Sequence, residues 1–147
     1  MIILGKIGDA AELLKTCDEV HLIVRSPREI KGVRWTPVLS PSKALFWDYR
    51  KWEKQGQWNA ECFAQRYAPR FLREMADSSE ARAMLNELWK KDRAGKKIAL
   101  LCFCGIESLC HRSIVGGLLK GAGCEVKTLR GDGSEYVKYY EQFKALR

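Results

Sequence analysis

Short apolar runs alternate with helical patterns along this chain. The runs at residues 1–4, 19–24, 97–104 and 124–129 are rich in aliphatic and β-branched side chains, with polar residues or glycine beside them. Runs of this length and composition predict strands. The compact run at 97–104 is typical of a strand that is buried on both faces.

Between these runs, apolar side chains recur at helical spacing. The stretches in the first two thirds of the chain open with residue types that cap helices, namely Asp9, Ser40 followed by Pro41, Asn59, and Ser78 or Ser79. Pro69 falls inside the pattern that starts at Asn59, which predicts a kink or a break there. Residues 111–122 and the segment around Tyr140 predict the last helices, and residues 26–39 predict a long connection.

The order of these elements predicts the fold class. Strand, helix and strand follow one another with tight joints around residues 97–129, which is the pattern of a βαβ unit and therefore of a parallel sheet. We expect an α/β protein with a mostly parallel sheet of about four or five strands, flanked by helices in a Rossmann-like three-layer arrangement. Residues 1–147 are expected to form a single domain.

Composition narrows the class of protein. A chain of 147 residues with 46% hydrophobic side chains suffices for one domain with a core. The longest uncharged apolar run, 98–106, is far shorter than a membrane span, and no signal peptide pattern is visible at the start. We therefore expect a cytoplasmic protein with no membrane partner.

The positive net charge of the chain favours anionic partners but does not identify one. The net charge of +8 suits a nucleotide or nucleic acid, and a solvated basic surface gives the same balance. Aromatic and cationic residues interleave locally, as in proteins that bind single-stranded nucleic acid. An amphipathic helix with a basic outer face has the same pattern and is the preferred interpretation. The residues concerned are Trp47, Trp52, Trp58, Arg50, Lys51 and Lys54.

The cysteines supply the sharpest local signal. Cys102, Cys104 and Cys110 lie within nine residues of one another and are followed directly by His111. In a reducing compartment this clustering indicates metal or thiol chemistry more than disulfides. The other histidine, His21, lies within a predicted strand and is expected to be a core or edge residue.

A candidate site follows from where these residues fall. Ligands of parallel sheets bind at the carboxyl ends of the strands, where Cys102 and Cys104 lie. The helix that follows begins with Cys110, His111, Arg112 and Ser113, and its first turn favours anions and thiolates.

The side chains of this site predict distinct roles. Cys110 or Cys102 is the expected nucleophile, with His111 as the proton carrier. Arg112 and Ser113 are expected to bind an anion. Arg25 ends another strand and is expected either to reach the same crevice or to hold the adjacent loop by a salt bridge. The alternative for the cysteines is a role as small buried hydrophobic residues.

Zinc is an alternative use of the same cluster. Cys102, Cys104, Cys110 and His111 supply the ligand types of a Cys₃His site. Their spacing differs from the usual Cys-x₂-Cys, and adjacent Cys110 and His111 are poorly placed to converge on one ion. We therefore expect no cofactor, and we keep zinc as the alternative.

The same motifs carry a resemblance to a known family. Leu101-Cys102, then Cys110-His111-Arg112-Ser113 and the apolar helix after it, resemble the bacterial domain-of-unknown-function family numbered 488. The hallmark of that family is Leu-x-Cys-x-Glu, a short loop, and Cys-His-Arg at a helix start. Val24-Arg25-Ser26 and Leu39-Ser40-Pro41-Ser42 resemble further family motifs, and the similarity runs from about residue 20 to 126. Cys104 stands where the family has Glu, so either Glu107 takes that role or the role is lost.

Two hypotheses for function remain. The leading one is an enzyme with a Cys/His/Arg anion-binding site that acts on a nucleotide or nucleic acid, with phosphodiester, glycosidic and acyl chemistry all open. The other is a nucleic-acid-binding or interaction module in which the Cys/His cluster is structural, with or without zinc.

Overall fold

The protein is a five-stranded parallel α/β fold in a computed structural model, which describes residues 1–146. The sheet has the order β3-β2-β4-β1-β5, and every neighbouring pair in it is parallel. This confirms the predicted fold class. The strands are β1 (Ile2–Lys6), β2 (Glu19–Leu22), β3 (Arg34–Trp35), β4 (Ile98–Cys102) and β5 (Val126–Lys127).

The central strand β4 is buried at every position, as its unbroken apolar run predicts. Successive side chains of a strand point to opposite faces. Ile98 and Leu100 therefore join the core that includes Ile114, whereas Ala99 and Leu101 join a second core with Leu22. Both faces of the sheet are thus covered.

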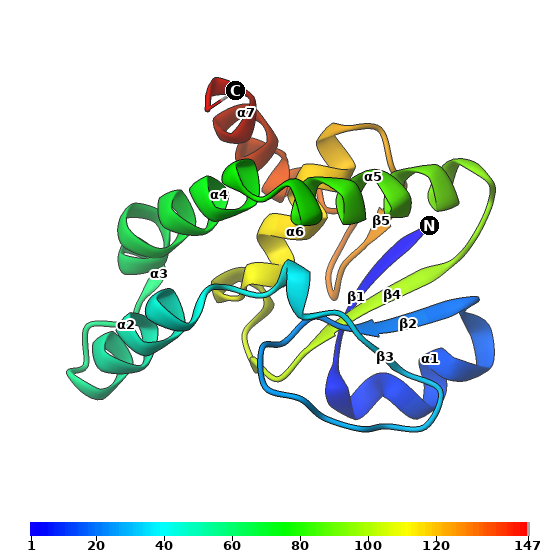
Figure 1. The fold of residues 1–147 in the computed structure, drawn as a ribbon, viewed down its shortest axis with the longest axis horizontal. Helices are drawn as coiled ribbons and strands as arrows, with labels where there is room; N and C mark the ends of the chain where they lie inside the picture. Colours follow the sequence, from blue (N-terminus) through cyan, green and yellow to red (C-terminus); the bar gives the residue numbers. More distant parts are fainter. Residues whose placement is uncertain (147) are drawn as a thin grey trace.

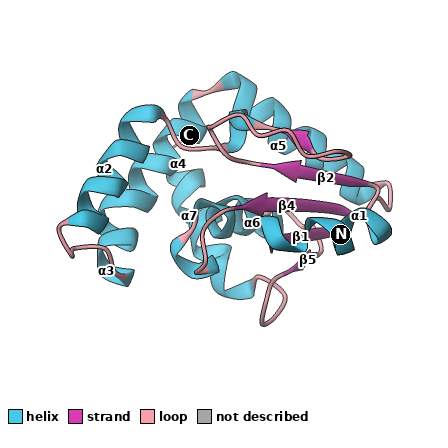
Figure 2. Ribbon diagram, turned by 90° about the horizontal axis from the view of Figure 1, so that it is seen from below, coloured by secondary structure: helices cyan, strands magenta, loops and turns pink. Residues whose placement is uncertain are grey.

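Helices cover the two faces and one end of the sheet. α1 (Ala10–Thr16) packs on one face, and α5 (Ser79–Arg93), α6 (His111–Gly121) and α7 (Val137–Ala145) pack around the other core. α2 (Lys43–Lys54), α3 (Ala60–Cys62) and α4 (Ala68–Asp77) lie together beside the sheet (Figure 1). The arrowheads of β2 and β4 point toward α2 and α4 in Figure 2, so these helices flank the carboxyl ends of the strands. Among the described residues, no helix is long and apolar enough to span a membrane.

The start of α2 differs from the prediction. The cap is Ser42, not Ser40, because the Ser42 hydroxyl accepts the Leu45 N–H at 3.1 Å and its own N–H and O–H are held by Glu74. Ser40 instead follows a 3₁₀ turn, Pro37–Leu39, and donates to the Pro37 carbonyl. The predicted connection at 26–39 therefore contains this turn, and it also contains the edge strand β3.

Two further helix starts follow the sequence, whereas the segment around Pro69 and the last strand differ from the prediction. Asn59 and Ser78 cap α3 and α5 as predicted. Pro69 neither breaks nor simply kinks its helix: a π-helical turn, Phe63–Tyr67, precedes it, and Pro69 lies in the first turn of α4. A wider turn accommodates a residue that lacks an N–H and crowds the preceding turn. The strand predicted at 124–129 shortens to Val126–Lys127.

Candidate functional site

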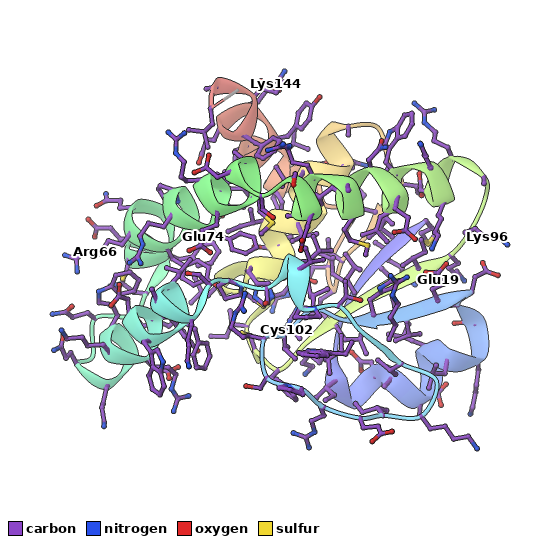
Figure 3. The ribbon with its side chains drawn as sticks, in the orientation of Figure 1. Glu19, Arg66, Glu74, Lys96, Cys102 and Lys144 are labelled. Atoms are coloured by element: carbon purple, nitrogen blue, oxygen red, sulfur yellow. The ribbon has the colours of Figure 1, made fainter. Side chains whose placement is uncertain are left out.

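The candidate site lies at the carboxyl ends of β2 and β4, two neighbouring strands whose connections run to opposite sides of the sheet. β2 leads outward to β3, whereas β4 leads through α6 to β5 on the far side of β1. A crevice forms between the carboxyl ends of two neighbouring strands whose connections diverge in this way. Figure 3 labels Cys102, which ends β4 near the middle of the molecule.

A cavity of about 760 Å³ opens at this point. Its base holds Cys102, Cys104, Cys110 and His111, and its walls are aromatic and cationic. None of its described lining residues carries a carboxylate. The wall residues with rings or charges are Arg25, Lys43, Phe46, Trp47, Tyr49, Arg50, Trp58, Tyr67 and Phe103.

The structure brings the predicted cysteines and His111 together. The Sγ atoms of Cys102 and Cys104 are 3.7 Å apart. His111 Nδ1 lies 3.9 Å from Cys102 Sγ and 3.8 Å from Cys110 Sγ. The Cys102, Cys110 and His111 ligand atoms all lie within 4.8 Å of one another. The expectation that Cys110 and His111 are poorly placed to converge is therefore wrong. Cys110 has an extended backbone and His111 a helical one, which turns both side chains to the same point.

A backbone carbonyl orients the His111 ring. His111 Nε2 lies 2.6 Å from the Ile23 carbonyl oxygen, which accepts the proton on that nitrogen. Because Nε2 donates its proton to this carbonyl, Nδ1 is the ring nitrogen that is left to contact the two sulfurs. His111 is 4% exposed, so this orientation is held by packing as well as by the hydrogen bond.

The sulfurs have unequal affinities for a proton. Hydrogen-bonding contacts with Cys104 and then with Cys110 hold the pKa of Cys102 well below its usual range. The same interaction with Cys102 raises the pKa of Cys104. Burial raises the pKa of Cys110. Within this cluster, the pKa of Cys102 is therefore the one that its neighbours lower.

Arg112 and Ser113 lie beside the cluster but do not line the cavity. Arg112 is 2% exposed, and its NH1 donates to the Cys104 carbonyl at 2.9 Å and to Cys110 Sγ at 3.6 Å. The Ser113 hydroxyl donates to the Cys110 carbonyl at 2.8 Å. These contacts brace the loop between β4 and α6, and Arg112 adds a positive charge next to the sulfurs.

Arg25 reaches the crevice, and it holds the adjacent loop by a hydrogen bond to a backbone carbonyl instead of the predicted salt bridge. It lines the cavity, and its Nε donates to the Pro41 carbonyl at 2.6 Å. This bond joins the end of β2 to the segment before α2, so Arg25 also fixes the distance between two walls of the cavity.

Glu107 does not take the place of the family Glu. Its carboxylate accepts the Leu129 N–H at 3.1 Å and the Tyr136 hydroxyl at 2.8 Å, and it does not line the cavity. Cys104, in the position of that Glu, is the residue that faces Cys102. A thiol therefore stands at the position where the motif resemblance implied a carboxylate.

Sequence reasoning missed most of the wall residues. Lys43 and Phe46 on α2 were not singled out, and the pattern that contains Trp47 and Arg50 was interpreted as an amphipathic helix with a basic outer face. Trp47 is 61% exposed and lines the cavity, so this aromatic ring does not belong to the buried face of the helix. The interleaved aromatic and basic pattern was the available signal for these residues.

The predicted role of His21 as a core residue is confirmed, since it is fully buried between Glu19 and Thr36.

Comparison with known proteins supports the resemblance seen in the motifs. Residues 3–123 match the family model described as the Active DUF488-N3 subclade. The match includes all but the first residue of β1, all of β2, β4 and α6, and every residue that lines the cavity. No curated protein and no solved structure shows a significant match to the chain.

Proposed function

This chain belongs to the DUF488 family, in its Active DUF488-N3 subclade, and from that premise we propose that it is a cytoplasmic enzyme that acts on a nucleotide or nucleic-acid substrate. One observation carries the proposal: the cavity joins a Cys/His cluster at its base to aromatic and cationic walls. The description of the subclade as active supports an enzyme over a binding module.

The charges around the cavity favour an anionic substrate. Arg25, Lys43 and Arg50 line it, and none of the described lining residues is acidic. Cations that converge on a concave, partly desolvated surface attract phosphate or carboxylate groups. Arg50 is also 3.6 Å from Glu53, an exposed ion pair that is weak enough to give way to a bound phosphate.

The rings around the cavity favour a substrate with a flat group. Trp47 and Phe103 are large apolar side chains that line the cavity and remain 61% and 44% exposed. Exposed aromatic surface next to cations is typical of sites that stack bases and bind the attached phosphate. A volume of about 760 Å³ is enough for one nucleotide. We therefore propose a nucleotide unit as the bound group.

The base of the cavity supports a covalent mechanism. His111 Nδ1 takes the proton of Cys102, and the Cys102 sulfur attacks an electrophilic carbon or phosphorus of the substrate. A sulfur bond to that atom forms, the bond to the leaving group breaks, and His111 delivers its proton to the leaving group. Neutral His111 then takes a proton from water, and the hydroxide releases the product and restores Cys102. Cys110 stays a second candidate nucleophile, since it contacts the same nitrogen.

A binding experiment tests the substrate class. Calorimetric titration of the reduced, chelator-treated protein with nucleoside monophosphates should give measurable affinity. Arg50→Glu should weaken that affinity by about tenfold or more, which is 1.4 kcal/mol. Lys51→Glu is the matched control, because Lys51 makes the same charge change on the same helix but does not line the cavity. Equal losses for the two variants would contradict an anion site in the cavity.

A turnover experiment tests the catalytic roles. The metal-free protein is incubated with nucleoside monophosphates, dinucleotides and a single-stranded oligonucleotide, and products and protein mass are followed together. Cys102→Ala should abolish turnover and any covalent adduct, whereas Cys17→Ala should retain both. Processing of the oligonucleotide alone would identify nucleic acid as the source of the nucleotide unit. Turnover by Cys102→Ala at the wild-type rate would remove the covalent mechanism.

A further inference from the structure

We infer that Cys102, Cys104, Cys110 and His111 also form a Zn²⁺ site, and that Zn²⁺ bound there holds the enzyme in an inactive state. The second half of this inference rests on the proposed function, because it concerns the same sulfur and nitrogen atoms. The first half, metal binding, stands on the geometry of the cluster alone.

Three distances within the cluster are close to those of a tetrahedral metal site. With zinc–sulfur bonds of about 2.3 Å and a zinc–nitrogen bond of about 2.0 Å, neighbouring ligand atoms lie about 3.5–3.8 Å apart. The separation of Cys102 Sγ and Cys104 Sγ is 3.7 Å. His111 Nδ1 is 3.9 Å from Cys102 Sγ and 3.8 Å from Cys110 Sγ. Cys102, Cys110 and His111 thus lie close together, with ligand atoms all within 4.8 Å of one another. Cys104 contacts this group through Cys102 and must turn further than the other three ligands to reach the ion.

The surroundings of His111 are those of a metal ligand. Histidines that bind zinc through one ring nitrogen usually donate the other N–H to a carbonyl or carboxylate, which fixes the ring. The Ile23 carbonyl, 2.6 Å from Nε2, provides that contact and leaves Nδ1 directed at the sulfurs. The site is thus oriented before any ion arrives.

Arg112 supplies the charge that such a site needs. Three thiolates, one neutral imidazole and Zn²⁺ sum to a single negative charge. Arg112 is 2% exposed, and it forms no ion pair with a carboxylate among residues 1–146. Its NH1 is 3.6 Å from Cys110 Sγ. A compensating charge stabilises a buried cation, and the metal-bound cluster provides one.

Metal binding and catalysis exclude each other in this arrangement. A zinc ion with four protein ligands has no open position for substrate or water. The ion would be coordinated by Cys102 Sγ and His111 Nδ1. In the proposed reaction, the first of these atoms attacks the substrate and the second carries the proton. The thiols that coordinate the ion release their protons to solvent. Cys104 completes the set, so this chain gains a fourth ligand from the thiol that stands where its family has Glu.

Titration of the reduced, chelator-treated protein with Cd²⁺ tests metal binding, because thiolate-to-cadmium charge transfer reports the number of bound sulfurs. We expect one Cd²⁺ per chain, proton release, and displacement by Zn²⁺. Cys104→Ser should reduce the charge-transfer band by one sulfur and weaken binding by more than about 100-fold, beyond the loss that an outer contact causes. Cys17→Ser is the control outside the cluster and should bind as the wild type does. Saturation at no defined stoichiometry, or an equal loss in the two variants, would overturn the inference.

A second readout separates this inference from the proposed function. Iodoacetamide labelling of Cys102 is followed by peptide mass with and without Zn²⁺. Labelling that is fast in the metal-free protein and blocked by one equivalent of Zn²⁺ supports the inactive state. Stoichiometric metal binding in a protein whose metal-free form has no turnover would refute the proposed function and leave the metal site standing. Turnover that saturating Zn²⁺ does not inhibit would overturn the inactive state.

Discussion

A buried histidine makes the stability of this protein depend on pH. His21 is fully enclosed, with Nδ1 2.8 Å from the Thr36 hydroxyl and Nε2 2.8 Å from Glu19. Burial lowers the pKa of His21, with Arg34 and Lys91 adding to the effect, although the contact with Glu19 acts in the opposite direction. The pKa of His21 is therefore lower in the folded state than in the unfolded state, where it is about 6.5.

The sign of the effect follows from that difference. The unfolded chain binds a proton at His21 more readily than the folded protein does, so stability is fully present above about pH 6.5 and falls as the pH drops below it. The expected slope is at most about 1.4 kcal/mol per pH unit. Urea unfolding between pH 5 and pH 7.5 measures it. His21→Gln removes the titrating group, and a slope that persists in this variant would assign the effect elsewhere.

Single residues also mark the limit of what the sequence can predict. The types and chain positions of Cys102, Cys110 and His111 sufficed to predict a common site, because a strand end and the next helix start meet at one edge of a parallel sheet. The direction of Glu107 could not be predicted in this way. Its carboxylate turns toward the Leu129 N–H and the Tyr136 hydroxyl, and both partners belong to a segment more than twenty residues away.

At the scale of elements, the packing of α6 against the segment before α7 depends on a glycine. A Cβ at Gly117 would collide with the backbone carbonyl of Tyr136, and backbone cannot move aside as a side-chain end can. At Gly116 the nearest atom is the end of the Leu4 side chain, at 2.7 Å. Alanine is a better helix former than glycine by about 1 kcal/mol, which works against destabilisation at both positions.

We therefore expect Gly117→Ala to lower the free energy of unfolding by about 1–3 kcal/mol, the usual cost of overpacking. Gly116→Ala should cost less, because Leu4 can change rotamer. Chemical denaturation of the two variants in parallel measures the difference. A Gly117→Ala protein as stable as the wild type would mean that α6 and α7 can separate without loss.

Elements with strong local signals were predictable, and those held by distant partners were not. The run at 97–104 and the caps Asn59 and Ser78 depend on neighbours in sequence, and they were placed correctly. Ser42, not Ser40, caps α2, because Glu74 on α4 binds the N–H and the hydroxyl of Ser42. β3 is a strand of two residues whose partners lie in β2. Neither interaction is visible before the chain folds.

At the scale of the whole molecule, the net charge of +8 is not gathered at the cavity. Lys96 and Lys97 precede β4, whereas Cys102 ends it. The lysines therefore lie at the amino ends of the strands, away from the cavity, and Figure 3 shows Lys96 far from Cys102. Five residues of strand span about 17 Å, which exceeds the Debye length of about 10 Å at 0.1 M salt. Charges at that end of the sheet should therefore contribute little to a ligand held in the cavity.

This separation of overall charge from local charge leads to a direct prediction. Reversal of both Lys96 and Lys97 to Glu lowers the net charge from +8 to +4, since each change removes two units. The affinity for nucleoside monophosphates at 0.1 M salt should nevertheless fall by less than it does for the single change Arg50→Glu. Calorimetry on the two proteins decides the matter. A greater loss in the double variant would mean that the basic field of the whole molecule attracts the ligand, and that the cations of α2 have no particular role.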